Sequence, residues 1–195
     1  FFFFENGAPS RFELSGNNLS QAPFNQGETP AHFVLSTRAD GMEAYLDARA
    51  GTSSPELFSA FASSTPRDLG PAFAAAFSVK PGVLIAITPK GVERVNADNG
   101  GRDTLLERPD LPVGKSAVAP DGSAIVLENA VTHALDVFSV DTLRADATSY
   151  IASLSVEGDA VAFTDATHFI VKTGNTYSVY SINADSLTKT ATPSL

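Results

Sequence analysis

Short apolar runs alternate with polar turns along the chain, and their order recurs. The stretch from Ser116 to Leu143 reads as an apolar run, an Asp-Gly turn, a second apolar run, a polar hairpin and an alternating segment. Runs of this length, bounded by turn residues, are typical of antiparallel β-strands. Helical periodicity is nearly absent, so the pattern predicts an all-β fold.

The same order of segments returns about every forty residues. The distance from Pro30 to Pro71 is 41 positions (71 − 30), and Gly41 precedes Gly82 by 41 positions (82 − 41). Gly122 follows Gly82 at 40 positions (122 − 82). A period near forty with several short strands per copy is the sequence signature of a radial array of β-sheets.

Each copy contains four predicted strands, here named a to d. Strand a is short and rich in small residues ("AAAF", "SAVA", "AVAF"), which suits a crowded position where sheets converge. A Gly- or Asp-containing turn leads to strand b, a nearly continuous apolar run such as "VLIAI" that is typical of a strand covered on both faces. Strand c alternates ("LDVFSV"), and strand d is polar and therefore predicted to lie outermost.

The turn Ala119-Pro120-Asp121-Gly122 and the strand "VFSVDTL" resemble the "SPDG" turn and third strand of β-propeller repeats of the YVTN-like and WD-like types. The segment "DAVAF…HFIVKTGNTYSVYSI" is also similar, more weakly, to hemopexin-like repeats. The resemblance implies antiparallel four-stranded repeats arranged as a β-propeller. The chain has no Trp, so the resemblance does not extend to a WD-type docking role. A β-sandwich is the alternative fold.

One propeller-like domain is predicted over residues 1–195, with a partial first blade that lacks its first strand. The predicted blades cover residues 1–28 (the partial blade), 29–69, 70–112, 113–153 and 154–195. Within the second blade, the segment from Ser53 to Ser64 reads either as strand c or as a short capped helix, because Ser precedes Pro-Glu there.

Composition excludes several classes of function. The formal net charge is −9 and the isoelectric point about 4.7, which gives no electrostatic basis for binding nucleic acid. The absence of cysteine excludes disulfides, thiolate metal sites and cysteine nucleophiles. It leaves the redox compartment open, since a cytosolic protein can equally lack cysteine. Because cysteine-free chains are common in the bacterial envelope and outside the cell, we expect an extracellular, periplasmic or cell-surface location. The longest apolar stretch is broken by Lys80, Pro81 and Gly82, so no transmembrane segment is predicted.

No motif of this sequence assigns catalysis. His32, His133 and His168 fall at different positions of the repeat, and neither a nucleophile elbow nor a phosphate loop is present. The segment from Asn96 to Glu107 has the spacing of a calcium loop, but Gly100 supplies no side-chain oxygen at its fifth position. We therefore expect an ordinary turn there and assign no catalytic, cofactor-binding or metal-binding residue.

The leading functional hypothesis is a non-enzymatic propeller scaffold that mediates protein–protein contacts at or outside the bacterial cell envelope. The four Phe of "FFFF" must point to both faces of a strand, so both faces need covering, by neighbouring blades or by another chain. A protein partner or self-association is therefore expected. One alternative is a structural subunit of a larger assembly, with this run as its contact. The other is a small-ligand receptor, hydrolase or lyase that uses the propeller channel, although strands a would line that channel mainly with Ala, Val, Phe and Ser.

Overall fold

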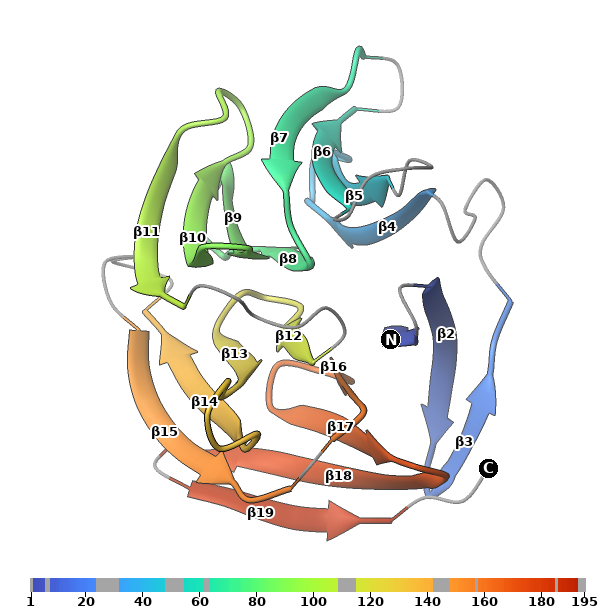
Figure 1. The fold of residues 1–195 in the computed structure, drawn as a ribbon. Coiled ribbons are helices and arrows are strands. Elements are labelled where there is room, and N and C mark those ends of the chain that lie inside the picture. The colour runs from blue at the N-terminus through green and yellow to red at the C-terminus, as the bar shows by residue number, and fades with distance from the viewer. Residues whose placement is uncertain are drawn as a thin grey trace.

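The computed structural model places five antiparallel sheets in a ring around a central axis, and this ring is a β-propeller (Figure 1). Four sheets have four strands each and one has three. The structure describes residues 2–5, 8–23, 32–47, 55–61, 64–108, 115–141, 148–156, 158–184 and 186–192. The predicted all-β propeller is confirmed, and the β-sandwich alternative is wrong.

Within each sheet the strands follow one another in chain order, from the axis outwards. Blade 1 consists of β1 (Phe2–Glu5), β2 (Ala8–Ser15) and β3 (Asn18–Gln21). Blade 2 consists of β4 (His32–Thr37), β5 (Glu43–Asp47), β6 (Glu56–Ala60) and β7 (Arg67–Pro71). Blade 3 consists of β8 (Ala74–Phe77), β9 (Val83–Thr88), β10 (Gly91–Asn96) and β11 (Arg102–Glu107).

The last two sheets continue the same plan. Blade 4 consists of β12 (Ser116–Val118), β13 (Ala124–Glu128), β14 (Leu135–Val140) and β15 (Thr148–Leu154). Blade 5 consists of β16 (Ala160–Phe163), β17 (His168–Thr173), β18 (Thr176–Asn183) and β19 (Ser186–Ala191). Each four-stranded sheet falls within one sequence repeat, except that β7 and β15 run slightly past the expected boundaries at residues 69 and 153.

The segment around residue 56 is a strand, so the helical interpretation is wrong and the interpretation as strand c is confirmed. β6 pairs on one side with β5 and on the other with β7. Sheet pairing satisfies the backbone of this segment on both sides, which outweighs a local Ser-Pro-Glu helix-start signal. The described part of the chain contains no helix that is long and apolar enough to cross a lipid bilayer.

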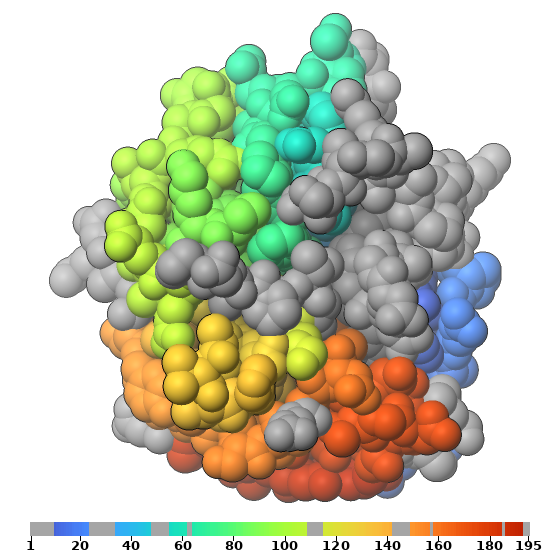
Figure 2. All heavy atoms as spheres, in the orientation of Figure 1, coloured from blue at the N-terminus to red at the C-terminus, as the bar shows by residue number. Residues whose placement is uncertain are grey.

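The core consists of apolar layers between neighbouring blades, and β9 shows how one strand serves two of them. Val83, Ile85 and Ile87 pack against blade 4. Leu84 and Ala86 point the other way and pack against blade 2. Successive side chains of a strand project to opposite faces, so a strand between two sheets must be apolar throughout. In the space-filling view, the yellow-green atoms of blade 3 lie directly against the yellow and orange atoms of blade 4 at the surface (Figure 2).

Small residues mark the strands closest to the axis. The innermost strands β8, β12 and β16 are neighbours around the axis, and they carry the sequences AAAF, SAV and AVAF. Hydrogen bonds join blades here and farther out. Phe77 N donates to Ser36 Oγ at 3.2 Å, and Ser59 Oγ donates to the carbonyl of Ala97 at 2.8 Å. The expectation that strand a occupies the crowded inner position is confirmed.

Blade 1 differs from the prediction that its first strand is missing. β1 pairs with β2 and lies beside β16, the innermost strand of blade 5, so β1 itself holds the inner position. Among the described residues, the position without a strand in this sheet is the outer one. The prediction of a missing first strand takes the apolar Phe run as strand b, and an apolar run is compatible with either of the two inner positions of a blade.

Candidate functional site

One end of the ring carries the a–b and c–d turns of the blades, and three of its a–b turns are built alike. In blades 2, 3 and 4 the turn glycine has a positive φ: +87° at Gly41, +73° at Gly82 and +73° at Gly122. Backbone bonds close two of these turns, from Gly41 N to the Arg38 carbonyl at 2.9 Å and from Gly122 N to the Ala119 carbonyl at 2.8 Å. Glycine adopts this conformation without steric cost, so the repeated glycine fixes the turns.

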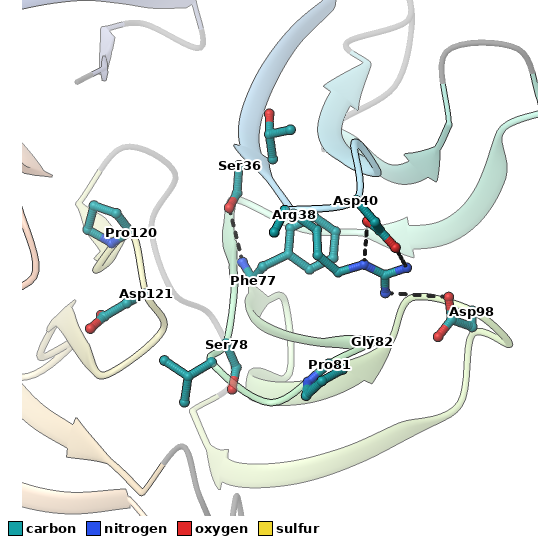
Figure 3. A pocket seen from close by; sticks show the side chains of 13 residues that line it. Ser36, Arg38, Asp40, Phe77, Ser78, Pro81, Gly82, Asp98, Pro120 and Asp121 are labelled. Atoms are coloured by element: carbon teal, nitrogen blue, oxygen red, sulfur yellow. Dashed lines mark hydrogen bonds and ion pairs between the residues drawn. The ribbon is translucent and has the colours of Figure 1, made fainter.

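An open hollow of about 600 Å³ lies among these three turns. Its walls come from the a–b turns of blades 2, 3 and 4 and from Asp98 in the c–d turn of blade 3 (Figure 3). We call it the turn hollow. Its volume lies within the range of about 300–1,000 Å³ that is usual for ligand sites.

Much of the turn hollow is apolar. Phe77 forms part of its wall and is buried in the core between blades 2 and 3. Val79 is 60% exposed although it is a large aliphatic residue, and Pro81 and Pro120 are exposed beside it. Exposed apolar groups held together on adjacent turns are a common mark of an interaction site.

Among the described residues that line the turn hollow, Arg38 is the one cation, and carboxylates lie around it. Its Nε and Nη2 donate to the two carboxylate oxygens of Asp40 at 2.8 and 2.7 Å. Its Nη1 lies 3.6 Å from Asp98 Oδ1, and the guanidinium lies over the Phe77 ring, 5.8 Å from the ring centre. The hydrogen bonds between Arg38 and Asp40 raise the pKa of the guanidinium and lower the pKa of the carboxyl.

Two further carboxylates lie at opposite sides of the turn hollow (Figure 3). Asp98 is 56% exposed, and it packs so closely on Gly82 that a Cβ there would lie 2.5 Å from Asp98 Oδ2. Asp121 Oδ1 accepts hydrogen bonds from Ser123 N at 3.0 Å and from Ser123 Oγ at 2.6 Å. The described residues that line the turn hollow thus include three carboxylates and one guanidinium, which give a net charge of about −2.

The central channel is a separate and smaller hollow of about 270 Å³. Ala75, Ala117, Val161 and Phe163 are representative of its lining, and Ser116 and Thr164 are its hydroxyl-bearing residues. As far as the described residues line it, the channel carries no ionisable side chain. The expected lining of Ala, Val, Phe and Ser is confirmed, and it offers no general acid or base.

Asp136, at the opposite end of the ring, is a buried and paired carboxylate. Asp136 accepts hydrogen bonds from Arg108 at 3.1 Å, Asn129 at 3.1 Å and Ser153 at 2.7 Å. Its side chain is only 8% exposed. Because Arg108 follows the outer strand of blade 3 and Asp136 lies on β14, this ion pair joins two blades.

The structure does not bring the three histidines together. His133 lies in the turn between β13 and β14, at the positive φ of 56°, with Nδ1 3.0 Å from Glu128 Oε1. His168 begins β17, and its Nδ1 lies 3.0 Å from Asp165. His32 lies on β4, and its side chain is outside the described part of the structure. Each thus occupies a different position of its repeat, as the sequence predicted.

The segment tested as a calcium loop forms the turn between β10 and β11. Asn96 Oδ1 accepts hydrogen bonds from the backbone amides of Asp98 and Asn99 at 2.9 and 3.0 Å. This is the Asx-turn that Asn commonly forms, and it confirms the prediction of an ordinary c–d turn. Within the described ranges, no three His, Asp or Glu side chains are grouped so as to hold a metal ion.

The turn hollow is not predicted from the sequence. The turns at Gly41, Gly82 and Gly122 are recognisable there, but their pattern indicates only a structural role. The available signal was the position three residues before each glycine, where the repeats carry Arg38, Val79 and Ala119. Variation at equivalent turn positions is typical of loops that carry function on a common scaffold.

Comparison with known proteins supports the fold. No protein-family model and no curated protein sequence matches the chain. Among solved structures, TolB from Acinetobacter baumannii superposes with a TM-score of 0.58 at 14% identity, covering 98% of this chain and 52% of the TolB chain. The chain therefore spans about half the length of TolB.

Two other solved structures show the same similarity. The β-propeller domain of Cps50 (Swd1) from Myceliophteria thermophila has a TM-score of 0.52 at 14% identity, covering 79% of this chain and 56% of that one. An oligogalacturonate lyase in complex with manganese has a TM-score of 0.53 at 11% identity, covering 80% of this chain and 50% of the lyase chain. At these identities the similarity shows the propeller fold alone, since propellers carry many unrelated functions.

Proposed function

We propose that the protein is a non-enzymatic binding module that docks a partner protein on the a–b turn end of its ring. The observation that carries the proposal is the turn hollow, an open depression of about 600 Å³ with Val79, Pro81 and Pro120 exposed around it. Burial of such apolar groups is the main favourable contribution to protein association.

The way the turns are held supports a binding role. Positive-φ glycines fix the three turns, and Phe77 anchors the wall of the turn hollow in the core. A preformed surface loses little conformational entropy on binding, which favours affinity. The turns are also the least constrained part of each repeat, so they can differ between blades without disturbing the core.

The proposal includes a location at or outside the cell envelope of a bacterium. Its support is the absence of cysteine among the 195 residues. Cysteine-free chains are common in the bacterial envelope and outside the cell. Fractionation of cells that express the natural gene, with the protein detected by antibody, tests the location. Detection in the cytoplasmic fraction alone contradicts it.

The binding function is tested by capture followed by reconstitution. The immobilised protein is used to capture a partner from an extracytoplasmic extract of its source, and the partner is then purified and mixed with the free protein. We expect a complex of defined mass by light scattering. The double variant Val79→Asp/Pro120→Asp should weaken the complex about tenfold or more, because buried interface anchors cost this much when replaced.

The control is Val131→Asp, since Val131 is 88% exposed at the opposite end of the ring. Its complex should keep the affinity of the wild type. The proposal is overturned if no partner forms a complex from purified components, or if Val131→Asp weakens the complex as much as the double variant.

The position of β1 bears on the alternative of a structural subunit. Phe2–Glu5 form an inner blade strand between β2 and β16, so the ring itself uses the backbone of the Phe run. We expect the full chain to be a monomer by light scattering and a chain without residues 1–5 to lose its cooperative unfolding transition. A full chain that assembles, with a folded monomer after the deletion, would favour the structural subunit instead.

A further inference from the structure

We infer that the turn hollow recognises a basic segment of the partner protein, with the apolar stems of lysine or arginine side chains on the turns and their cationic ends at Asp98 and Asp121. This inference rests on the proposed binding function and specifies the chemistry of its ligand. The observations that carry it are the charge of the turn hollow, the free capacity of these two carboxylates, and the apolar surface between them.

Arg38 does not neutralise the turn hollow. Its two short bonds go to Asp40, and its contact with Asp98 is longer, at 3.6 Å. A carboxylate has about four lone-pair positions, so Asp98 retains capacity for a second cation. Both hydrogen bonds to Asp121 end on Oδ1, which leaves Oδ2 for a donor from outside the protein.

The surface between these carboxylates suits the aliphatic part of a long cationic side chain. Figure 3 shows Ser78 and Pro81 between Asp98 and Asp121, and Val79 lies on the same turn, 60% exposed. Lysine and arginine place their methylene stems along apolar surface while their charged ends stay hydrated or paired. Acidic ligands lack this match, because they would meet three carboxylates and a guanidinium that is already paired.

The negative charge is a local property of the turn hollow rather than of this whole end of the ring. A neighbouring hollow of about 480 Å³ shares Pro81 but is lined by Lys80 and Arg94 together with Asp103. The β8–β9 turn thus separates an acidic hollow from one with more cations than anions. Of these two hollows, only the turn hollow is therefore favourable for a basic segment. The net negative charge of the whole protein would attract a basic segment without directing it to either hollow.

The test is selection from a phage-displayed library of random heptapeptides against three forms of the protein. These are the wild type, the variant Asp98→Asn/Asp121→Asn, and the control Glu13→Gln/Glu107→Gln. Glu13 and Glu107 are exposed on β2 and β11, outside the turn hollow. Both double variants remove two negative charges, so they have the same net charge and differ only in where it was lost.

We expect the wild type and the control to select peptides enriched in lysine or arginine beside apolar residues, and the Asp98→Asn/Asp121→Asn variant to lose this enrichment. For a selected peptide, calorimetry should show about fivefold weaker binding to that variant, the effect of removing two exposed ion pairs. The control should stay within about twofold. No basic enrichment on the wild type, or equal loss in both double variants, overturns the inference.

The same variants separate this inference from the proposed function. If the purified partner complex is weakened by Val79→Asp/Pro120→Asp but not by Asp98→Asn/Asp121→Asn, the binding function stands and the basic ligand is wrong. If no partner complex forms at all, the binding function itself is wrong. Weakening by both variants, with the Glu13→Gln/Glu107→Gln control unaffected, supports both.

Discussion

Two carboxylates at opposite ends of the ring, Asp136 and Asp98, are held in opposite ways. At the end with the b–c turns, Asp136 is 8% exposed and accepts three hydrogen bonds from neighbouring side chains. At the end with the a–b turns, Asp98 is 56% exposed and has one long contact, to Arg38. A buried charge must be paired to be tolerated, whereas an exposed one can remain available to a ligand. Burial, rather than residue type, thus separates a carboxylate that holds two blades together from one that stays accessible to solvent.

Replacement of Asp136 by Ala should have the largest effect. Arg108, Asn129 and Ser153 would lose their shared acceptor, and the connection between blades 3 and 4 would be weakened. We expect a loss of about 3 kcal/mol in the free energy of unfolding, measured by urea denaturation. A loss below about 0.5 kcal/mol would show that this ion pair is not structural and would remove the contrast between the two ends.

Replacement of Gly122 by Val tests which parts of the a–b turn end are structural. Gly122 has a φ of +73°, and a Cβ there would lie 3.1 Å from Ile85 Cγ1 and 3.3 Å from Ser78 Cα. We expect the free energy of unfolding, measured by urea denaturation, to fall by about 2 kcal/mol, because backbone strain and this close contact both destabilise the folded state.

The matched control is Gly41→Val. Gly41 has a similar φ of +87°, but a Cβ there would meet no atom of the described residues within 4 Å. The Gly41→Val variant should therefore lose only the contribution of backbone strain, about 1 kcal/mol of the free energy of unfolding. Equal losses in the two variants would show that the contact with blade 3 does not contribute.

Acidification should act through Asp40 with a smaller effect. The hydrogen bonds from Arg38 lower the pKa of Asp40 in the folded protein below its ordinary value of 3.8. The folded state therefore binds this proton less readily than the unfolded chain does. The stability that results is present above that ordinary value and is lost as the pH falls through the lower pKa of the folded state.

This loss is measured as the difference in Tm between the wild type and Asp40→Asn. The difference should shrink as the pH is lowered from about 5 to about 2, because protonation removes the same charge that the substitution removes. A difference that stays constant over this range would show that the pair between Arg38 and Asp40 does not couple protonation to folding.

The double variant Asp98→Asn/Asp121→Asn should change stability least. Both side chains are largely or partly exposed, and Asn can still accept the hydrogen bonds from Ser123 that close the Asp121 turn. We expect the free energy of unfolding to stay within about 0.5 kcal/mol of the wild type. A larger loss would show that Asp98 and Asp121 stabilise the fold, as Asp136 does. The contrast with Asp136, on which their proposed role depends, would then be wrong.

Much of the fold could be predicted from the local sequence. The turn glycines recur because a tight turn needs positive φ at that point, whatever surrounds it. Strand b is apolar throughout because both of its faces are covered. The predicted strand positions in blade 1 were wrong because large apolar residues were expected on strand b rather than on the innermost strand. Only the position of β1 beside β16 shows that the Phe run is the inner strand.

The sequence alone determined the repeat, the strand order within a blade and the conformation of the turns, because each depends on residues close together in the chain. Only the tertiary structure decided which side chains meet between blades. Arg38 and Asp98 are 60 positions apart in the chain (98 − 38), and their side chains meet at one side of the turn hollow. Their meeting depends on how the sheets pack around the axis, and hydrophobic burial drives that packing without specifying the polar groups at its edge.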